Sequence, residues 1–385
     1  MLDLQDDPVF PALSRLTADD LERITGASLV KVLRIRHQPG ARAVLHVGLG
    51  KGSRSEGVIW FFWPDKVARL REGNPHLAFD PATGALFEPF PTDHRLPEVG
   101  RFMQDRQALA ARLLDAPPAG APELLRYRPG LSATFRWVSQ GGGVHFVKVA
   151  RKAQVAGQAR MIAELSARLE GGPLAVAGVA GVAPEHAAIS YRAAEGRPFD
   201  RLMTEEPDAH IPGLVARLTD ALGDLWSCRM PGLPAETRAD YLTRAQRSAE
   251  IIAAADAGVG RLAQQVLDRC ARQRVAPRNC PIHADLKPDH AFVSEARVML
   301  IDTESLKLGD PDHDLALLDA RLDIPVAMGM LAPARRDLIR QSLRRVAGAD
   351  YGWYLALARL HSAKYFAQRP DPERVPRMMA VLTAG

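Results

Sequence analysis

The chain has 385 residues, of which 47% are hydrophobic and 25% charged, and its formal net charge is +5. These values are typical of a globular protein and exclude global disorder and fibrous structure, while the length suggests two or three domains or lobes. The surplus of positive charge is arginine spread along the whole chain, without a dense basic run interleaved with aromatic residues. The sequence therefore does not favour nucleic-acid binding.

The sequence shows no pattern typical of a membrane span, a signal peptide or a disulfide framework. No apolar run approaches the roughly 18 residues of a membrane span, and the acidic N-terminus lacks the basic and apolar regions of a signal peptide. Cys228, Cys270 and Cys280 are too few and too scattered for a disulfide framework or a zinc cluster. We expect a cytoplasmic protein without a membrane partner; no pattern indicates its oligomeric state.

The first third of the chain reads as a β-rich region. A short helix is predicted at 16–26, with Thr17 as its N-cap. Strands at 31–36, 43–48 and 58–63 follow, separated by Pro39-Gly40 and by a Gly/Ser-rich turn at 50–57. A hairpin at 77–80 and 85–90, a helix at 97–115 and a linker at 116–122 complete the region. We expect the aromatic run at 60–63 to be core or lobe interface.

The same pattern restarts after the linker. Pro129-Gly130 lies ninety positions after Pro39-Gly40, and the flanking residues 124–130 and 33–40 are similar. This similarity indicates a weak internal duplication of a β-hairpin unit. The alternative is that the two hairpins share a Pro-Gly turn by chance.

The second copy continues differently from the first. A strand at 144–150 carries Lys148, a charged residue in the middle of an apolar segment. A helix at about 154–169 and a strand at 187–191 follow, and beyond Gly196 the chain is mainly helical. The remaining predicted helices are 211–229, 236–257, 259–274, 333–347 and 351–366.

One stretch, residues 281–318, concentrates polar side chains. Asp302 ends the apolar strand Val-Met-Leu-Ile, where a carboxylate is costly without a partner. Mg²⁺ usually takes one or two carboxylates plus substrate phosphates, so we expect a magnesium site there. Asp285 lies in a loop between two strand-like ends, and a carboxylate so placed can accept a hydroxyl proton during phosphate transfer.

These residues resemble the aminoglycoside phosphotransferase-like branch of the protein-kinase-like fold. That family has a catalytic loop His-x-Asp, then four residues, then Asn; a strand ending Ile-Asp-x-Glu/Asp; and Gly-Asp-Pro with a later Asp-Leu-Ala. Here His283 and Asp285, then Asp302 and Glu304, then Gly309-Asp310-Pro311 and Asp314-Leu-Ala match in order and spacing. The resemblance implies that Asp285 is the catalytic base and that His283 belongs to the catalytic loop, mainly as a brace. We interpret Asp314 as a helix N-cap that steadies this loop, and Asp310, Asp312 and His313 as turn residues.

The resemblance also implies an upstream nucleotide lobe. Lys148 matches the phosphate-binding lysine of the family, and Glu164 the carboxylate that pairs with it. The hairpin around Ser132 and Thr134 would cover the phosphates. The segment from Tyr191 to Ala193 would be the hinge whose backbone bonds adenine.

The chain departs from the family at one ligand position. His290 stands where the family has its second metal ligand, Asn, and imidazole is a poorer partner for Mg²⁺ than an amide oxygen. Asp289 or Glu304 is the alternative oxygen donor. With an ordinary pKa of about 6.5, His290 would stop ligating in mildly acidic solution.

We therefore expect an α+β, protein-kinase-like bilobal fold with a β-rich nucleotide lobe, a helical substrate lobe and an N-terminal β-rich extension. The expected domains are 1–115, a degenerate copy of the nucleotide lobe; 123–194, the nucleotide lobe; and 195–385, the helical lobe. The expected activity uses ATP and Mg²⁺ to phosphorylate a hydroxyl of a small molecule, and the resemblance implies a sugar, amino sugar or amino alcohol.

Two other classes stay open. A non-catalytic, pseudokinase-like binding protein would explain His290 and the N-terminal copy. A metallohydrolase built on residues 283–290 would lack a nearby second His-x-His, and it would leave Lys148 and Glu164 unexplained.

Overall fold

The computed structural model of the chain describes residues 7, 9–50, 55–151 and 155–384. Residues 51–54 of the predicted Gly/Ser turn and residue 154 of a predicted helix lie outside this part. The chain divides into two compact units. Unit 1 comprises Met1–Ala159, Val179–Ala193 and Gln368–Pro372, and unit 2 comprises Arg160–Gly178, Ala194–Ala367 and Glu373–Gly385.

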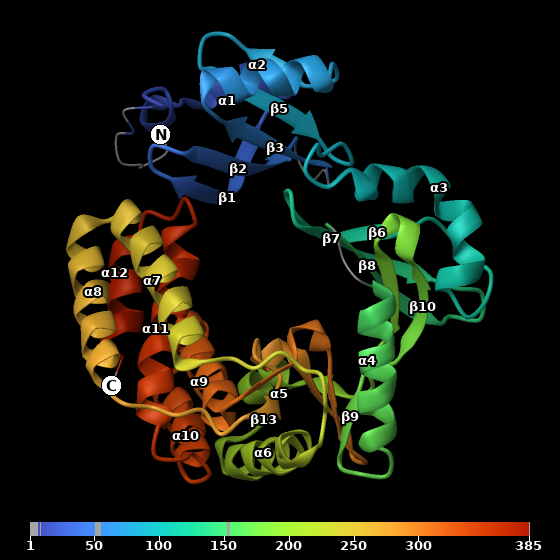
Figure 1. Cartoon of the computed structure of the whole chain (residues 1–385), viewed down its shortest axis with the longest axis vertical. Helices are drawn as coiled ribbons and strands as arrows, with labels where there is room; N and C mark the ends of the chain where they lie inside the picture. Colours follow the sequence, from blue (N-terminus) through green and yellow to red (C-terminus); the bar gives the residue numbers. More distant parts are fainter. Residues whose placement is uncertain (1–6, 8, 51–54, 152–154, 385) are drawn as a thin grey trace. The chain divides into compact units, whose positions relative to one another are not determined.

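The first sheet of unit 1 has five antiparallel strands in the order β1-β2-β3-β5-β4 (Figure 1). The strands are β1 (Val30–Gln38), β2 (Arg42–Leu49), β3 (Ser55–Phe61), β4 (Ala78–Asp80) and β5 (Ala85–Pro89). Each lies where the sequence predicts a strand. Trp60, Phe61 and Phe62 are buried, as expected for core residues, whereas Trp63 is exposed.

Helix α1 (Ala18–Thr25) packs on the first sheet and starts as predicted. Thr17 and Asp20 form a capping box, in which each side chain accepts the backbone N–H of the other residue. Gly26, with φ of 66°, ends the helix in the left-handed region. Lys66, which follows Pro64-Asp65, lies in a helix that was not predicted, α2 (Pro64–Gly73). Proline at the first helical position favours a helix start.

The second sheet of unit 1 also has five antiparallel strands, in the order β6-β7-β8-β11-β10. The strands are β6 (Glu123–Arg128), β7 (Ser132–Val138), β8 (Val144–Ala150), β10 (Val179–Ala183) and β11 (Ala188–Arg192). Helix α3 (Pro97–Leu113) packs against β8, β10 and β11 (Figure 1). Its buried side chains Phe102, Leu109 and Leu113 join the sheet residues Phe135 and Val147 in one core.

The two sheets share one topology. In each, a three-stranded meander is followed by a helix, and the last strand of the sheet in chain order pairs with the third strand. The helix is α2 in the first case and α4 (Val155–Arg168) in the second. The meanders begin with matching hairpins, because Gln38 pairs with Arg42 across Pro39-Gly40 as Arg128 pairs with Ser132 across Pro129-Gly130. This agreement supports the proposed duplication.

Unit 2 contains a small sheet, a β-ribbon and the helices. The sheet has the order β12-β14-β15-β9, and β13 pairs with β16 in the ribbon. Its strands are β9 (Leu174–Val176), β12 (Arg197–Pro198), β13 (Cys280–Ile282), β14 (Ala291–Val293), β15 (Val298–Leu300) and β16 (Lys307–Gly309). The helices are α5 (Phe199–Glu205), α6 (Ile211–Ser227), α7 (Arg238–Ala255), α8 (Ala257–Arg272), α9 (Pro311–Ala327), α10 (Pro333–Arg344), α11 (Tyr351–Ala367) and α12 (Arg374–Thr383).

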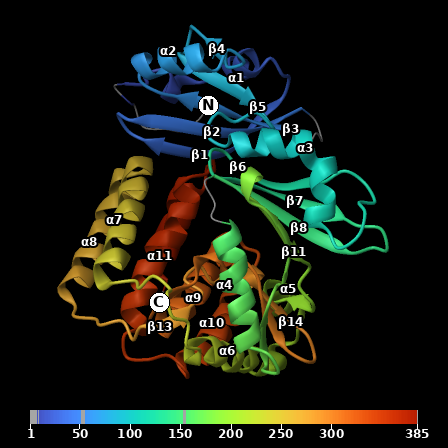
Figure 2. The same cartoon turned by 45° about the vertical axis from the view of Figure 1, so that its right-hand side comes forward.

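Helices α7, α8 and α11 lie side by side (Figure 2). Helix α11 also packs on α9 and α12. A buried ion-pair network joins α9 to α10, since Arg340 contacts both Asp319 and Asp323. Strands β9 and β10 and helix α12 were not predicted. The stretch that holds β9 and β10 is rich in Ala and Gly, which have low strand propensity, and pairing with β15 and β11 decides its conformation. None of the described helices is both long and apolar enough to cross a membrane.

Candidate active site

One buried carboxylate, Asp314, anchors the loop that carries Asp285. Asp314 is fully buried in the first turn of α9. The backbone N–H groups of His283 and Ala284 donate to its two oxygens at 2.8 and 2.9 Å. Ala284 itself has a φ of 63°, in the left-handed region. The two hydrogen bonds therefore hold the loop in a conformation that a non-glycine residue rarely adopts.

The expectation that Asp314 steadies this loop is confirmed, but its assignment as a helix N-cap was wrong. The N-cap of α9 is Asp310, whose side chain accepts the N–H of Asp312. Asp312 and His313 are helical residues and not turn residues. The helix starts earlier than predicted because Pro311 occupies its first position. Arg278 also pairs with Asp310 at 3.0 Å.

His283 links the loop to the strand that precedes Asp302. Its side chain is fully buried, and its Nε2 lies 2.9 Å from the carbonyl oxygen of Ile301. The N–H of Ile301 in turn donates to the carbonyl oxygen of His290 at 3.0 Å. These contacts fit the expected bracing role of His283.

Asp285 presents a half-exposed carboxylate, with 41% of its side chain accessible. The ammonium of Lys287 lies 2.5 Å from its Oδ2 atom. Burial raises the pKa of Asp285, but the neighbouring Lys287, together with further positive charge such as Arg321, outweighs this effect, so the pKa lies below its usual value. Asp285 is therefore ionised at neutral pH. Sequence reasoning missed Lys287, although lysine is scarce in this chain and this one lies two residues after Asp285.

His290 and Asp302 are neighbours in the fold. The Nε2 atom of His290 lies 3.5 Å from Oδ2 of Asp302 and 3.4 Å from Nζ of Lys287. Asp302 adopts the left-handed conformation, with φ of 58°, and Glu304 follows in a 3-10 turn, Thr303–Ser305. A separation of 3.5 Å allows both donor atoms to reach one ion at about 2.0–2.1 Å. The donor set fits a divalent cation, although imidazole is a poorer partner for Mg²⁺ than an oxygen donor.

The predicted acid sensitivity of His290 is wrong. Burial lowers the pKa of His290 to about 4, and the positive charge of Lys287 adds to this effect. The ring is 3% exposed and is neutral in mildly acidic solution. The ordinary pKa of about 6.5 belongs to a hydrated ring. In the buried ring the charged form would lack hydration, so protonation is disfavoured.

The residues expected to bind nucleotide lie in the second sheet of unit 1. Thr134 on β7 pairs directly with Lys148 on β8, and Ser132 pairs with Ala150 at the same end of the hairpin. Tyr191 in β11 pairs with Phe146 in β8. The N–H of Ala193 donates to the carbonyl oxygen of Val144 at 3.1 Å, so this N–H serves the sheet and not a ligand.

Glu164, the expected partner of Lys148, belongs to unit 2, whereas Lys148 belongs to unit 1. On α4 the Glu164 carboxylate pairs with Arg168, one helical turn later, at 2.7 Å. Both side chains of this pair are more than a third exposed. The ion pair between Lys148 and Glu164 stays a prediction.

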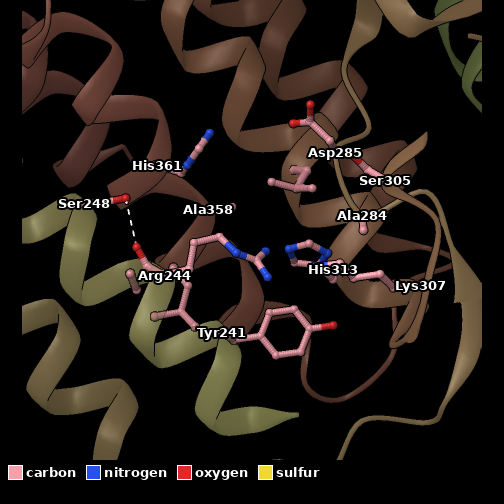
Figure 3. Close-up of a pocket in the computed structure, with 13 residues that line it drawn as sticks. Tyr241, Arg244, Ser248, Ala284, Asp285, Ser305, Lys307, His313, Ala358 and His361 are labelled. Atoms are coloured by element: carbon pink, nitrogen blue, oxygen red, sulfur yellow. Dashed lines mark hydrogen bonds between the residues drawn. The ribbon is translucent and has the colours of Figure 1, made fainter. Parts of the chain in front are cut away.

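A cavity of about 240 Å³ lies beside Asp285, within unit 2 (Figure 3). Its walls come from α7, α9, α11, β16 and the Asp285 loop. Asp285 therefore stands at the wall of a space in which a small molecule can bind. No sequence pattern indicated the wall residues of α7 and α11, because they are distant in the chain from the catalytic motif.

The described residues contain one group of three potential metal ligands with closely spaced donor atoms, Glu88, Asp93 and His94 in unit 1. These carboxylates already have partners. Trp60 Nε1 donates to Glu88 at 2.8 Å, and Tyr127 Oη donates to Asp93 at 2.7 Å. The group is a polar contact between the two sheets. Among the described residues, the 283–304 region offers no such group.

Comparison with known proteins defines the family. The profile of the phosphotransferase enzyme family matches residues 123–357, and no curated protein matches the chain. Among solved structures, amicoumacin kinase hAmiN in complex with AMP-PNP, Ca²⁺ and Ami is similar, with 11% identity over 74% of this chain and 94% of that one and a TM-score of 0.50.

Two further solved structures have lower TM-scores to this chain. A choline/ethanolamine kinase family protein from Mesorhizobium loti has 16% identity over 73% of this chain and 99% of that one, with a TM-score of 0.46. A macrolide 2'-phosphotransferase from Brachybacterium faecium has 14% identity over 74% of this chain and 99% of that one, with a TM-score of 0.43. The α+β fold with a protein-kinase-like arrangement is thus confirmed, and the chain belongs to the phosphotransferase enzyme family.

Proposed function

We propose that the chain transfers the γ-phosphate of ATP to a hydroxyl group of a small molecule in a magnesium-dependent reaction. The observation that carries the proposal is the ionised, half-exposed Asp285 carboxylate at the wall of a cavity, on a loop that buried Asp314 anchors. Asp285 orients the acceptor hydroxyl by accepting its hydrogen bond and then takes its proton as the phosphate is transferred.

The other site residues divide between phosphate binding and metal binding. Lys148, with Ser132 and Thr134 of the hairpin, would contact the ATP phosphates. Asp302 and Glu304, with His290, would hold Mg²⁺, which when bound neutralises charge on the phosphates. Tyr191 and the neighbouring backbone up to Ala193 would form the adenine hinge without the N–H of Ala193, which is bonded to Val144, and Glu164 would orient Lys148. In this proposal residues 1–115 are a structural extension, 123–194 the nucleotide lobe and 195–385 the catalytic lobe.

The proposal is tested with the purified full chain and Mg·ATP. ADP release is measured over a panel of hydroxyl compounds that includes sugars, amino sugars and amino alcohols. With the best acceptor, Asp285→Ala is expected to lower turnover by at least about 100-fold and to retain nucleotide binding. Glu170→Ala, at an exposed position, is the control and leaves turnover unchanged.

Two outcomes would contradict the proposal. If a folded Asp285→Ala variant keeps its turnover, Asp285 is not the base. If the chain binds ATP but releases no ADP with any acceptor, the pseudokinase-like alternative is favoured.

A further inference from the structure

The cavity beside Asp285 has cationic walls. Arg244 on α7 and Lys307 on β16 both line it, and each side chain is 36% exposed. Figure 3 shows the Arg244 guanidinium extending into the cavity toward His313, with Lys307 beside His313. The guanidinium also lies over the ring of Tyr241, 5.6 Å from its centroid, which keeps the group oriented.

One carboxylate serves both cations. Glu236, 1% exposed, pairs with the ammonium of Lys307 at 2.9 Å and also with the guanidinium of Arg244. Among the described residues that line the cavity, Asp285 is the only carboxylate, and its nearest cation is Lys287. Among the described residues that line the cavity, the two cations Arg244 and Lys307 thus outnumber the single carboxylate, Asp285.

The remaining walls do not offset this charge. His313 and His361 face the cavity, and burial lowers the pKa of both rings, so both are neutral. Leu317 and Leu357 add apolar surface. Burial also lowers the pKa of Arg244, as expected for a cation whose hydration is incomplete. A cation with incomplete hydration gains from an anionic partner, and guanidinium binds carboxylate or phosphate through paired hydrogen bonds.

The volume limits the size of that partner. Pockets for drug-sized ligands measure about 300–1,000 Å³, whereas this cavity measures about 240 Å³. It suits a molecule with a short carbon skeleton. A cationic amino sugar or amino alcohol would meet the excess positive charge and would be repelled.

We propose that the phosphate acceptor is a small hydroxyl compound that carries a carboxylate or phosphate group, bound as an anion by Arg244 and Lys307 with its hydroxyl at Asp285. This inference rests on the proposed phosphotransferase function and selects the chemical class of its acceptor.

The first test uses acceptors that share one skeleton and differ in charge: glycerate, glycerol 3-phosphate, glycerol and serinol, and in parallel glucuronate, glucose 6-phosphate, glucose and glucosamine. ADP release is expected to have its highest kcat/KM with an anionic member of a series, and the ratio of carboxylate to phosphate identifies the source of the charge. If a neutral or cationic member is best, the inference is overturned although the proposed function stands.

The second test measures anion binding without turnover. Isothermal titration with inorganic phosphate and with glycerate compares the wild type with Arg244→Gln, in which Lys307 still compensates Glu236. Losing one charge-assisted contact is expected to weaken binding at least about tenfold. Arg247→Gln, an exposed arginine on the same helix, is the matched control and leaves binding unchanged.

The binding test and the ADP-release test lead to separate conclusions. If ADP is released from no member of either series, the proposed function loses its support and the acceptor assignment falls with it, whereas phosphate or glycerate binding that depends on Arg244 would still show that the cavity holds an anion. Equal affinities of the wild type and Arg244→Gln for both anions would overturn the inference.

Discussion

Trp60 occupies the same position in the first sheet that Lys148 occupies in the second. With the two Pro-Gly hairpins aligned, Val44 corresponds to Thr134; Val44 pairs with Trp60, and Thr134 pairs with Lys148. Trp60 is fully buried and donates its indole N–H to Glu88. The first sheet thus has a packed aromatic residue where the second has a cation. This supports the proposal that residues 1–115 form a degenerate copy without a phosphate contact.

Lys148 in the second sheet and Lys66, just after the third strand of the first sheet, should differ in their effect on ATP use. Lys148→Ala is expected to raise the KM for ATP at least about tenfold, because a charge-assisted phosphate contact is lost. Lys66→Ala should leave the KM unchanged, since the Lys66 ammonium lies over the Phe62 ring, 3.7 Å from its centroid. It should cost about 0.5–1 kcal/mol of unfolding free energy instead. Equal losses of ATP affinity would contradict the assignment of the nucleotide lobe.

Removing the anchor of the catalytic loop should impair catalysis through the backbone. In Asp314→Asn, one of the two loop N–H groups faces an amide NH₂ and loses its acceptor, at a cost of about 1–3 kcal/mol. Hydrogen exchange at the amides of His283 and Ala284 should accelerate, and kcat should fall at least about tenfold. Asp220→Asn, at an exposed position of α6, is the control. Unchanged exchange at these amides would show that Asp314 does not hold the loop.

The buried network of Arg340 should contribute strongly to the stability of unit 2. Arg340 donates to Asp319 at 2.8 Å and to Asp323 at 3.0 Å, and all three side chains are nearly inaccessible. Arg340→Met leaves buried carboxylates without this cation and should cost about 3–5 kcal/mol in urea unfolding. Arg197→Met removes a cation that pairs with exposed Glu205 and should leave the unfolding free energy almost unchanged, because solvent screens this pair. Equal losses of unfolding free energy in the two variants would refute this distinction between a buried and an exposed ion pair.

The stability of unit 2 should fall in mild acid because of His313. Burial, with Arg244 and Lys307 nearby, lowers the pKa of His313 to about 3 in the folded state. Above the unfolded-state pKa of about 6.5 neither state binds the proton. Below it the unfolded state binds a proton that the folded state excludes, so unfolding free energy falls by up to about 1.4 kcal/mol per pH unit.

The pH effect is measured by urea unfolding between pH 7.5 and about 5, followed by tryptophan fluorescence. His313→Gln should reduce the slope without abolishing it, because His290 and His361 of unit 2 are also buried with lowered pKa values. The control is His210→Gln, whose side chain is 65% exposed, and this variant should keep the wild-type slope. Identical slopes in all three proteins would exclude His313 as the origin.

Much of the architecture was predictable because it depends on local patterns. Alternating apolar residues and Pro-Gly turns placed the meanders of both sheets, and Thr17 placed the start of α1. The motif from His283 to Asp314 identified the catalytic loop, since those residues lie within one short stretch of chain. Local signals failed for β9 and β10, whose Ala- and Gly-rich segments become strands only by pairing with other strands.

What the sequence by itself determined is the position of the candidate catalytic motif and the order of many of the elements. Only the tertiary structure decided which side chains surround Asp285. Arg244, Lys307 and His361 come from α7, β16 and α11, and no spacing along the chain relates them to the motif. Tertiary burial also decided that the ring of His290 is neutral, because its pKa depends on the loss of water and on the nearby Lys287 charge, which sequence patterns do not contain.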